Sequence, residues 1–373
     1  MRPFHSLILM VLMALSVNPA NAANIDIDKL LQRIKLPAGF RINLFARVPD
    51  ARSMVVGKRR NTVFVGSKSR HLFALLDTDK DGIADVVKKI SDRMRAPNGV
   101  AIMDGSLYIG MRNKIVKWPG QSETNLDRPL KPLETIFTGL NNRAHHGYRV
   151  IAFGPDRKLY VAIGAPCNVC LGKGHEGSII RMDPNGNNIE VVARGVRNSV
   201  GFDWHPKTKE LFFTDNGSDG LGDDIPADEL NHVTQAGQHF GFPYYGGGDT
   251  RTPQFKGRPP PGDARQPAIK FQAHSANLGL HFYRGDMFPA EYKHDAFVAQ
   301  HGSWNRSSPV GYRIMRIRFN HMGLPVGKEV FASGWLQGED YWGRPVGIEE
   351  LADGSLLVSD DFVGAVYRIS YGG

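Results

Sequence analysis

The chain has 373 residues, enough to bury the core of one large β architecture or of two ordinary domains. Its formal net charge is +9 at pH 7, and apart from the cluster GKRR at 57–60 the basic residues are spread along the chain. Charge distributed in this way favours an anionic small ligand or an acidic partner and argues against nucleic acid.

Residues 1–22 have the features of a secretory signal peptide. Arg2 supplies a positive N-terminal region, the apolar run at 7–15 is too short to span a bilayer, and ANA at 20–22 offers small residues for cleavage. A retained anchor is the alternative. We therefore expect a periplasmic or secreted protein whose mature chain covers 23–373, with no later segment apolar enough to cross a membrane.

Strand signals dominate the rest of the chain. A short helix is predicted at 27–34, and an alternating run follows at 40–48. Six further runs begin with a polar turn and continue with aromatic and β-branched residues, which is typical of β-hairpins. They are NTVFVGS (61–67), DGSLYIG (104–110), DRKLYVAIG (156–164), TKELFFTDNG (208–217), HDAFVAQHG (294–302) and DGSLLVSDD (353–361).

The spacing of these runs indicates a repeat of about fifty residues with several strands in each unit. Six units predict an all-β fold, a six-bladed β-propeller that forms one domain over 23–373, and a long insertion at 219–293 accounts for the widest gap. A large sandwich or two β-domains are the alternatives. In a propeller, 40–48 would close the ring by pairing with the last blade, and loops from different blades would converge on a central channel.

Two segments offer side chains for proton transfer and for binding oxygen atoms. His145 and His146 precede the third run, and a neutral imidazole is a natural proton acceptor, although a histidine beside a turn is more often a surface residue. Arg197 and Asn198 enter the fourth unit, where a guanidinium can bind carboxylate or carbonyl oxygen and an amide can both donate and accept. An ordinary blade-entry loop is the alternative for this pair.

Two acidic segments are candidates for a metal. DNGSDGLGDDIPADELNHV at 215–233 combines Asp with Gly-rich turns, which suits the oxygen ligands of Ca²⁺, although a solvated acidic loop has the same composition. DTDKDGIAD at 77–85 resembles the first half of a calcium loop, but Lys88 stands where the bidentate Glu belongs. We interpret that segment as a hairpin turn.

The two cysteines, Cys167 and Cys170, are predicted to form a local disulfide, because export favours oxidation. Leu171 follows the second cysteine where haem c attachment requires His, and two thiolates are too few for a closed zinc site. The chain therefore carries no haem attachment motif.

Two loops place Trp beside Arg, at 300–313 and 338–347. An aromatic ring next to a guanidinium suits a planar or polyhydroxylated ligand, so Trp304 and Trp342 are candidate substrate contacts. A Trp that caps the core with an Arg lying along it is the alternative.

Taken together, these segments resemble the soluble glucose/sorbosone dehydrogenases that use pyrroloquinoline quinone (PQQ), most closely the L-sorbosone dehydrogenase-like branch. The resemblance rests on HHGYRVIAFGPDRKLYVAIGAPCNVC, GSIIRMDPNG, ARGVRNSVGFDWHP, DNGSDGLGDDIPADELNHV, HGSWNR, WGRPVG and DGSLLVSDDFVGAVYRISY, in order along the chain. It implies a six-bladed propeller with PQQ over the channel mouth, held by basic side chains and by Ca²⁺.

The resemblance also implies roles for single residues. His146, three residues before Arg149, matches the general base, and His145 would orient it or contact substrate. Arg197 and Asn198 match the pair that contacts the quinone, with Arg197 polarising its C5 carbonyl. The backbone carbonyls of two further residues would hold calcium, and four more side chains would contact the cofactor. These are Gly217 and Ser218 for calcium, and Arg344, Arg306, His301 and Asn98 for the cofactor.

The function predicted from this resemblance is an exported PQQ-dependent dehydrogenase that oxidises an aldose or sugar aldehyde at C1 by hydride transfer to PQQ. Without a haem in the chain, the electrons would pass to a separate acceptor, a cytochrome or a quinone. A calcium-dependent propeller lactonase or other hydrolase, and a non-catalytic propeller that binds glycans or proteins, remain as alternatives.

Overall fold

The computed structural model describes residues 26–57, 62–120, 126 and 132–372. The predicted signal peptide lies outside the described residues. Among those described, no helix combines the length and the apolar character that crossing a membrane requires.

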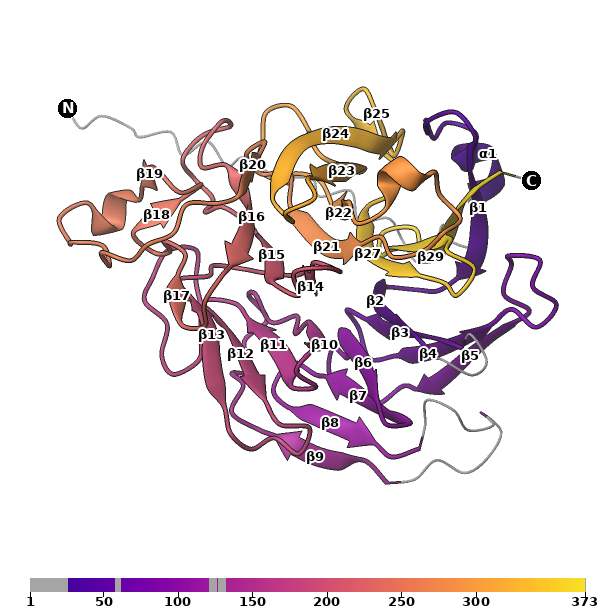
Figure 1. Ribbon diagram of the computed structural model, residues 1–373, viewed down its shortest axis with the longest axis horizontal. Coiled ribbons are helices and arrows are strands. Elements are labelled where there is room, and N and C mark those ends of the chain that lie inside the picture. The colour runs from indigo at the N-terminus through magenta and orange to yellow at the C-terminus, as the bar shows by residue number, and fades with distance from the viewer. Residues whose placement is uncertain (1–25, 58–61, 121–125, 127–131, 373) are drawn as a thin grey trace, which may run out of the picture.

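Six sheets stand around a common axis as the blades of a β-propeller, which confirms the predicted fold (Figure 1). The strands of the first three blades are β2 (Ala51–Val56), β3 (Val63–Ser67), β4 (Leu72–Leu76) and β5 (Val86–Ser91); β6 (Gly99–Met103), β7 (Ser106–Gly110), β8 (Ile115–Trp118) and β9 (Glu134–Phe137); and β10 (Ile151–Phe153), β11 (Leu159–Ile163), β12 (Ser178–Met182), β13 (Glu190–Arg194) and β17 (Gln238–His239).

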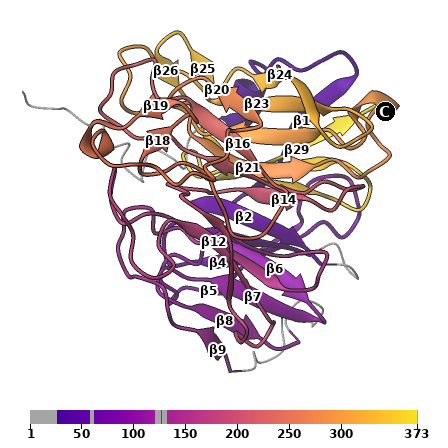
Figure 2. The same ribbon diagram turned by 60° about the vertical axis from the view of Figure 1, so that its left-hand side comes forward.

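The strands of the last three blades are β14 (Phe202–Trp204), β15 (Leu211–Asp215), β16 (Asp228–Val233) and β20 (Ile269–Phe271); β21 (Asn277–Phe282), β22 (Ala296–Gln300), β23 (Arg313–Phe319) and β24 (Pro325–Ser333); and β27 (Pro345–Glu350), β28 (Leu356–Asp360), β29 (Ala365–Tyr371) and β1 (Phe40–Arg47). Outside the blades lie α1 (Ile27–Leu31), two 3₁₀ helices, η2 (Pro253–Phe255) and η3 (Ala290–Tyr292), and two hairpins, β18 (Tyr245–Gly246) with β19 (Thr250–Arg251) and β25 (Leu336–Gln337) with β26 (Asp340–Tyr341). Both hairpins project on the same side in Figure 2.

Each of the six sequence runs contains the second strand of a blade. All five residues are buried in each of these strands, which are β3, β7, β11, β15, β22 and β28. The blades stack face to face, so neighbours cover both faces of a second strand. An alternating sequence therefore does not mark a solvent-exposed face here.

The ring closes as the sequence predicts. β1 pairs antiparallel with β29, from Phe40 opposite Tyr371 to Arg47 opposite Ala365. The last blade is thus completed by the first strand of the chain, so β29 presents no open edge.

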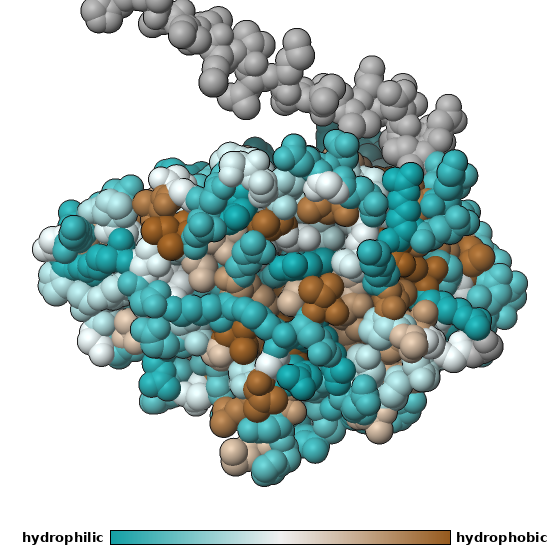
Figure 3. Space-filling view, turned by 90° about the horizontal axis from the view of Figure 1, so that it is seen from above, coloured by the Kyte–Doolittle hydropathy of each residue, from teal (hydrophilic) through white to brown (hydrophobic). Residues whose placement is uncertain are grey.

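Buried apolar clusters fill the spaces between neighbouring blades. In one of them, Leu357 of β28 clusters with Val63 of β3 and joins the last blade to the first. Hydrophilic side chains dominate the edge-on face in Figure 3, with apolar ones in small scattered patches. The hydrophobic driving force is therefore concentrated between the blades.

Apolar side chains also close the middle of the channel. Val200, Leu278 and Val346 form a buried cluster there, and Val150 packs against it. The inner strands approach closely, because a Cβ added at Gly201 would lie 2.1 Å from the Leu278 carbonyl oxygen. Glycine at this position allows two neighbouring blades to meet at the axis.

Two expectations need correction. The predicted helix at 27–34 is shorter, and its N-cap is Asp26, which accepts a hydrogen bond from the Lys29 backbone N–H. The segment 219–293 is not one insertion, because it contains β16, β20 and β21 as ordinary blade strands. β16 escaped notice because its sequence, DELNHV, is polar although most of it is buried.

Candidate active site

Polar side chains gather at one end of the blades. Successive strands run antiparallel, so the segment that enters the first strand and the loop that leaves the second lie at the same end. The loops after β11, β15, β22 and β28 therefore meet the segments before β2, β10, β14 and β21 at one mouth of the channel.

A cavity of about 390 Å³ lies at this mouth, within the size range of small-molecule sites. Seven of the residues predicted from the sequence line it, namely His145, His146, Arg197, Asn198, Gly217, His301 and Trp304. Val200 and Leu278, from the apolar cluster in the channel, also line it. Four blades contribute at least one of its lining residues.

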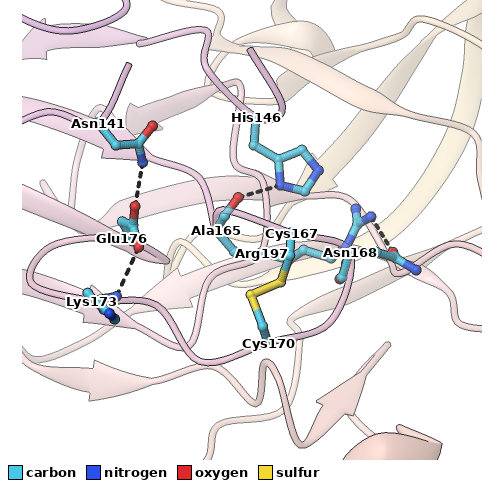
Figure 4. Close-up of a disulfide and its surroundings, with 9 residues drawn as sticks. All are labelled: Asn141, His146, Ala165, Cys167, Asn168, Cys170, Lys173, Glu176 and Arg197. Atoms are coloured by element: carbon cyan, nitrogen blue, oxygen red, sulfur yellow. Dashed lines mark hydrogen bonds between the residues drawn. A yellow bond between two sulfur atoms is a disulfide. The ribbon is translucent and has the colours of Figure 1, made fainter. Parts of the chain in front are cut away.

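His146 is held with one ring nitrogen already occupied. Its Nδ1 lies 2.9 Å from the carbonyl oxygen of Ala165 (Figure 4). A carbonyl only accepts, so Nδ1 carries the proton and Nε2 is left as an acceptor. The loop between β9 and β10, which carries His146, is held by Arg149. This fully buried side chain donates to the His146 and Asn141 carbonyl oxygens at 3.0 and 3.1 Å.

The imidazole of His146 is neutral over the whole physiological range. Burial first, and then the positive charge of Arg197, lower the pKa of His146 from 6.5 to about 2. The neighbouring ring of His145 lies with its centroid 3.8 Å away. The Nε2 of His146 is therefore unprotonated and can accept a hydrogen bond, but a pKa this low also makes the imidazole a weak base in the protein without ligand.

Arg197 is held on several sides. Its Nε and Nη2 donate to the backbone oxygen and Oδ1 of Asn168 at 3.0 and 2.7 Å, and Nη1 donates to the Asn216 carbonyl at 3.2 Å. Nη2 also forms an ion pair with Asp219 at 2.8 Å. Four of the five guanidinium N–H groups are thus engaged, which leaves one on Nη1.

A second cationic group reaches the cavity from the first blade. Arg52 donates to the Asp361 carboxylate at 3.0 Å and lies 4.6 Å over the ring of Tyr148. Asp361 also accepts from Nε2 of His301 at 2.8 Å. Burial lowers the pKa of His301 to about 4. His301 is therefore neutral at pH 7. Its hydrogen bond, together with the positive charges of Arg52 and Lys68, holds the pKa of Asp361 well below its usual range.

The predicted calcium segment follows β15. The backbone N–H of Gly217 donates to buried Asp228 at 2.8 Å, which fixes the turn. On either side of Gly217, the buried Oδ1 of Asn216 and Oγ of Ser218 have no hydrogen-bond partner among the described residues. Buried oxygen atoms without partners are what a hard cation would satisfy.

Two carboxyl groups are buried beneath this segment. Asp215 and Glu229 lie opposite one another on β15 and β16. Burial raises the pKa of both, and the negative charge of Asp215 adds to the rise at Glu229. Asp215 accepts hydrogen bonds from the backbone N–H groups of Arg197 and Asn198, so it positions the loop between β13 and β14.

Five predicted residues are not among those that line the cavity, and most of them make contacts that are structural. Asn98 is fully buried, accepts from Arg52 Nε at 2.9 Å and donates to the Arg149 carbonyl at 3.1 Å. Arg344 lies over Tyr312 and Tyr341 and donates to the His301 carbonyl at 3.0 Å.

The other three lie nearby. Arg306 bonds to Asp223 and Asp224 of the loop after β15. Trp342 donates its indole N–H to the Gly334 carbonyl at 2.7 Å. Ser218 lies in a smaller space with Asp215 and Glu229. Their roles toward a cofactor or substrate stay predictions.

Several lining residues were missed by the sequence analysis. They are Arg52, Tyr148, Asn216, Asp219, Asp228, His274 and Asn305. Arg52 is the second residue of β2, and Tyr148 and Asn198 lie just before β10 and β14. A polar residue near the start of a blade's first strand is therefore the sequence feature that would have indicated Arg52.

The two cysteines are joined in the structure as Cys167–Cys170, in the loop after β11 (Figure 4). Asp77, Asp79 and Asp85 bring carboxylate oxygens within 4.8 Å of one another, the one such group of three found within the described ranges. They lie in the hairpin between β4 and β5, at the end of the blade opposite the cavity. This agrees with the hairpin interpretation of 77–85.

Comparisons with known proteins agree with this arrangement. Residues 110–303 match the family described as Glucose / Sorbosone dehydrogenase, and residues 261–372 match one described as TrAA12-like. A protein of Borreliella burgdorferi described as uncharacterized is 35% identical over 365 residues, which cover 94% of each chain.

Solved structures share the fold. A Carbohydrate-Active Enzymes Family AA12 protein of Trichoderma reesei is similar with a TM-score of 0.78 at 18% identity, covering 91% of this chain and 98% of that one. The PQQ domain of pyranose dehydrogenase from Coprinopsis cinerea, in its holo form, gives 0.74 at 18% identity over 90% and 97%. A PQQ-bound aldose sugar dehydrogenase of Streptomyces coelicolor gives 0.64 at 19% identity over 90% and 99%.

The first of these family matches spans more than half of the chain, and its segment carries His146, Arg197, Asn198 and Gly217. The chain therefore belongs to the glucose/sorbosone dehydrogenase family.

Proposed function

We propose that this protein is an exported quinoprotein dehydrogenase that oxidises an aldose or sugar aldehyde at C1 with PQQ and Ca²⁺. The observation that carries the proposal is the pairing of a neutral, buried imidazole with a fixed guanidinium at one cavity. His146 offers Nε2 as a proton acceptor, and Arg197 keeps one N–H group unengaged. Proton removal beside a fixed positive charge is what oxidation of a sugar hydroxyl requires.

The lining of the cavity suits a planar, anionic cofactor. Arg52 and Arg197 supply positive charge from different blades, and Asn198 and Asn305 supply amide groups. Trp304 has an exposed fraction of 75% and lies at the mouth, where a sugar ring can stack on it. The carboxylates of Asp219 and Asp361 already face the two arginines, so an anionic ligand must share them.

The roles of the side chains follow from these positions. When bound, PQQ supplies the two-electron acceptor that takes the hydride from C1. Nε2 of His146 takes the proton of the C1 hydroxyl, and Arg197 faces the oxygen on which negative charge develops. Val200 and Leu278 close the floor of the cavity with apolar surface, which strengthens both interactions by excluding water.

In this proposal, calcium binds at the turn after β15. The backbone carbonyls of Gly217 and Ser218 would hold it, with the unpartnered Oδ1 of Asn216 available as a further oxygen. The metal would fix the cofactor and act as a Lewis acid on it. The electrons would leave to a separate acceptor, a cytochrome or a quinone.

The hydrolase alternative needs a cage of carboxylates around its metal. Within the described residues, the one group of three clustered carboxylates lies in the hairpin at 77–85, at the opposite end of its blade. The cavity instead combines arginines, histidines and amides with two carboxylates, Asp219 and Asp228, which belong to no such group of three. This favours the dehydrogenase over the lactonase.

One experiment separates the candidate functions. Purified protein is given PQQ and Ca²⁺, and dye reduction is followed with aldoses, sorbosone-like aldehydes and lactones. Sugar-dependent dye reduction that requires PQQ supports the proposal. Lactone hydrolysis without PQQ would support the hydrolase, and inertness throughout would support a binding protein.

The matched variants are His146→Ala and His321→Ala. His321 is an exposed histidine in the turn between β23 and β24, so its replacement controls for loss of an imidazole elsewhere. We expect His146→Ala to lower turnover by about 10³-fold while PQQ stays bound, and His321→Ala to keep full turnover. Full turnover in His146→Ala would remove His146 from its role as base.

A further inference from the structure

The disulfide lies beside the arginine of the candidate site. Cys167 and Cys170 close a loop of four residues, and Asn168 lies inside it, facing Arg197 (Figure 4). The connection between β11 and β12 that contains this loop runs over 164–177 and has no strand or helix of its own. The covalent bridge is therefore a major local restraint on the backbone around Asn168.

Asn168 bonds to both members of the ion pair at the cavity. Its backbone oxygen accepts from Arg197 Nε at 3.0 Å, and its Oδ1 accepts from Arg197 Nη2 at 2.7 Å. The same Oδ1 accepts from the backbone N–H of Asp219 at 2.8 Å, while Nδ2 donates to the Asp219 carbonyl at 2.8 Å. One asparagine thus fixes a side chain and a backbone segment together.

These contacts continue across the mouth. Asp219 accepts from Arg197 Nη2 through one carboxylate oxygen and from Asn305 Nδ2, at 2.9 Å, through the other. Asn168 follows β11, Asp219 follows β15 and Asn305 follows β22, so the chain of contacts joins the loops of three consecutive blades. Moving Asn168 would disturb all three loops at the side of the cavity where Arg197 lies.

The orientation of a guanidinium matters as well as its presence. A forked donor is useful only when its N–H groups point at the position of the ligand oxygen, and misplacement by about 1 Å costs up to about 100-fold in rate. Arg197 has an exposed side-chain fraction of only 5%, so it cannot reorient freely once the ligand arrives. Its position must be set beforehand by its neighbours.

We propose that Asn168, held by the Cys167–Cys170 bridge, is a positioning residue that presets Arg197 and Asp219 for the cofactor. This inference rests on the proposed function, because the ligand that Arg197 receives is the quinone. The bridge acts structurally in this account: it limits the conformations of the loop and so reduces the entropy lost when the cofactor binds.

The first test needs no cofactor. Backbone hydrogen exchange of Asp219 is measured in the wild-type protein and in the double variant Cys167→Ser/Cys170→Ser. We expect exchange at Asp219 to rise about tenfold or more when the bridge is absent, because its acceptor on Asn168 is no longer held. Asn185→Ala, at the opposite end of the same blade, is the control and should leave this exchange unchanged. Unchanged exchange in the double variant would overturn the inference.

The second test measures binding of PQQ in the presence of Ca²⁺. Asn168→Ala and the double cysteine variant should each raise the Kd about tenfold, with unchanged circular dichroism showing that they fold. In an Arg197→Ala background, Asn168→Ala should add no more than about twofold, because the residue acts through Arg197. A purely structural role would give additive effects, and additivity would overturn the inference.

The two proposals fail in different ways. If the wild-type protein binds no PQQ, the proposed function falls, and the exchange at Asp219 alone decides whether the bridge and Asn168 hold the site. If the wild type binds PQQ and the double cysteine variant binds it equally well, the proposed function stands and the positioning role is overturned.

Discussion

His146 and Gly164 lie so close that a Cβ added at residue 164 would be 2.5 Å from the Cβ of the histidine. His146 itself has a φ of 48°, in the left-handed region that few side chains adopt. The loop before the third blade is therefore pressed against the end of β11, where the Ala165 carbonyl fixes the tautomer of the imidazole. Glycine at 164 is required by this contact.

Gly164→Ala should displace the base without removing it. We expect turnover to fall about 100-fold, because the imidazole moves by a fraction of its hydrogen-bonding distance. The matched control is Gly262→Ala, where an added Cβ meets nothing within 4 Å. Turnover of both variants is measured after reconstitution with PQQ and Ca²⁺. Equal activity of the two would show that the position of His146 does not limit the reaction.

The pH dependence should lack the usual histidine step. Because burial and the charge of Arg197 lower the pKa of His146 to about 2, the base stays neutral as pH falls through 6.5. Histidine-selective NMR of the protein without cofactor should show an imidazole signal that does not shift between pH 5 and 8 and that is missing from the spectrum of His146→Gln. A signal assigned in this way that titrates near 6.5 would contradict the buried position of the ring.

Glu349 should make the fold less stable at high pH. It lines a cavity of about 500 Å³ at the other mouth of the channel, and burial raises its pKa from 4.5 to about 7. The folded state therefore binds more protons than the unfolded state between these two values, so this group's contribution to stability falls as pH rises through that window. Glu349→Gln should raise the free energy of unfolding at pH 8 by about 1–2 kcal/mol and leave it unchanged at pH 4.

Denaturant unfolding at the two pH values measures this difference, and the exposed Glu339→Gln is the control. A stabilisation of Glu349→Gln that is the same at pH 4 and pH 8 would mean that charge burial is not its cause.

The second strand of every blade could be predicted from the sequence, because short apolar runs follow polar turns at each of them. β16 could not be predicted in this way. Its residues Asp228, Glu229 and Asn231 are polar although they are buried, so its sequence resembles that of a loop. The histidine and arginine of the cavity were singled out through local motifs, and the family resemblance, rather than the motifs alone, suggested their roles, which stay predictions. The pairing of Arg52 with Asp361 was not found, because it joins residues 309 positions apart that only the closing of the ring brings together.

Calcium should stabilise the protein through the turn at 216–218. Adding Ca²⁺ to chelator-treated protein should raise the unfolding midpoint. At a Ca²⁺ concentration about 100 times the Kd, binding should raise the free energy of unfolding by about 2.7 kcal/mol. Asn216→Ala should reduce this stabilisation, because it removes an oxygen that has no partner. Asp79→Asn, in the carboxylate cluster at 77–85, should keep it. If Asp79→Asn reduced the stabilisation and Asn216→Ala kept it, calcium would bind at the hairpin instead of at the turn.

In the proposed function, loops from several blades form a binding site for PQQ around Arg197 and His146. Purified wild-type protein titrated with PQQ at equilibrium, in the presence of Ca²⁺, shows whether this site exists. We expect saturable binding of one PQQ per chain that Arg197→Ala weakens and His146→Ala leaves nearly intact. Absence of binding by the folded, calcium-supplied wild-type protein would contradict the proposed function.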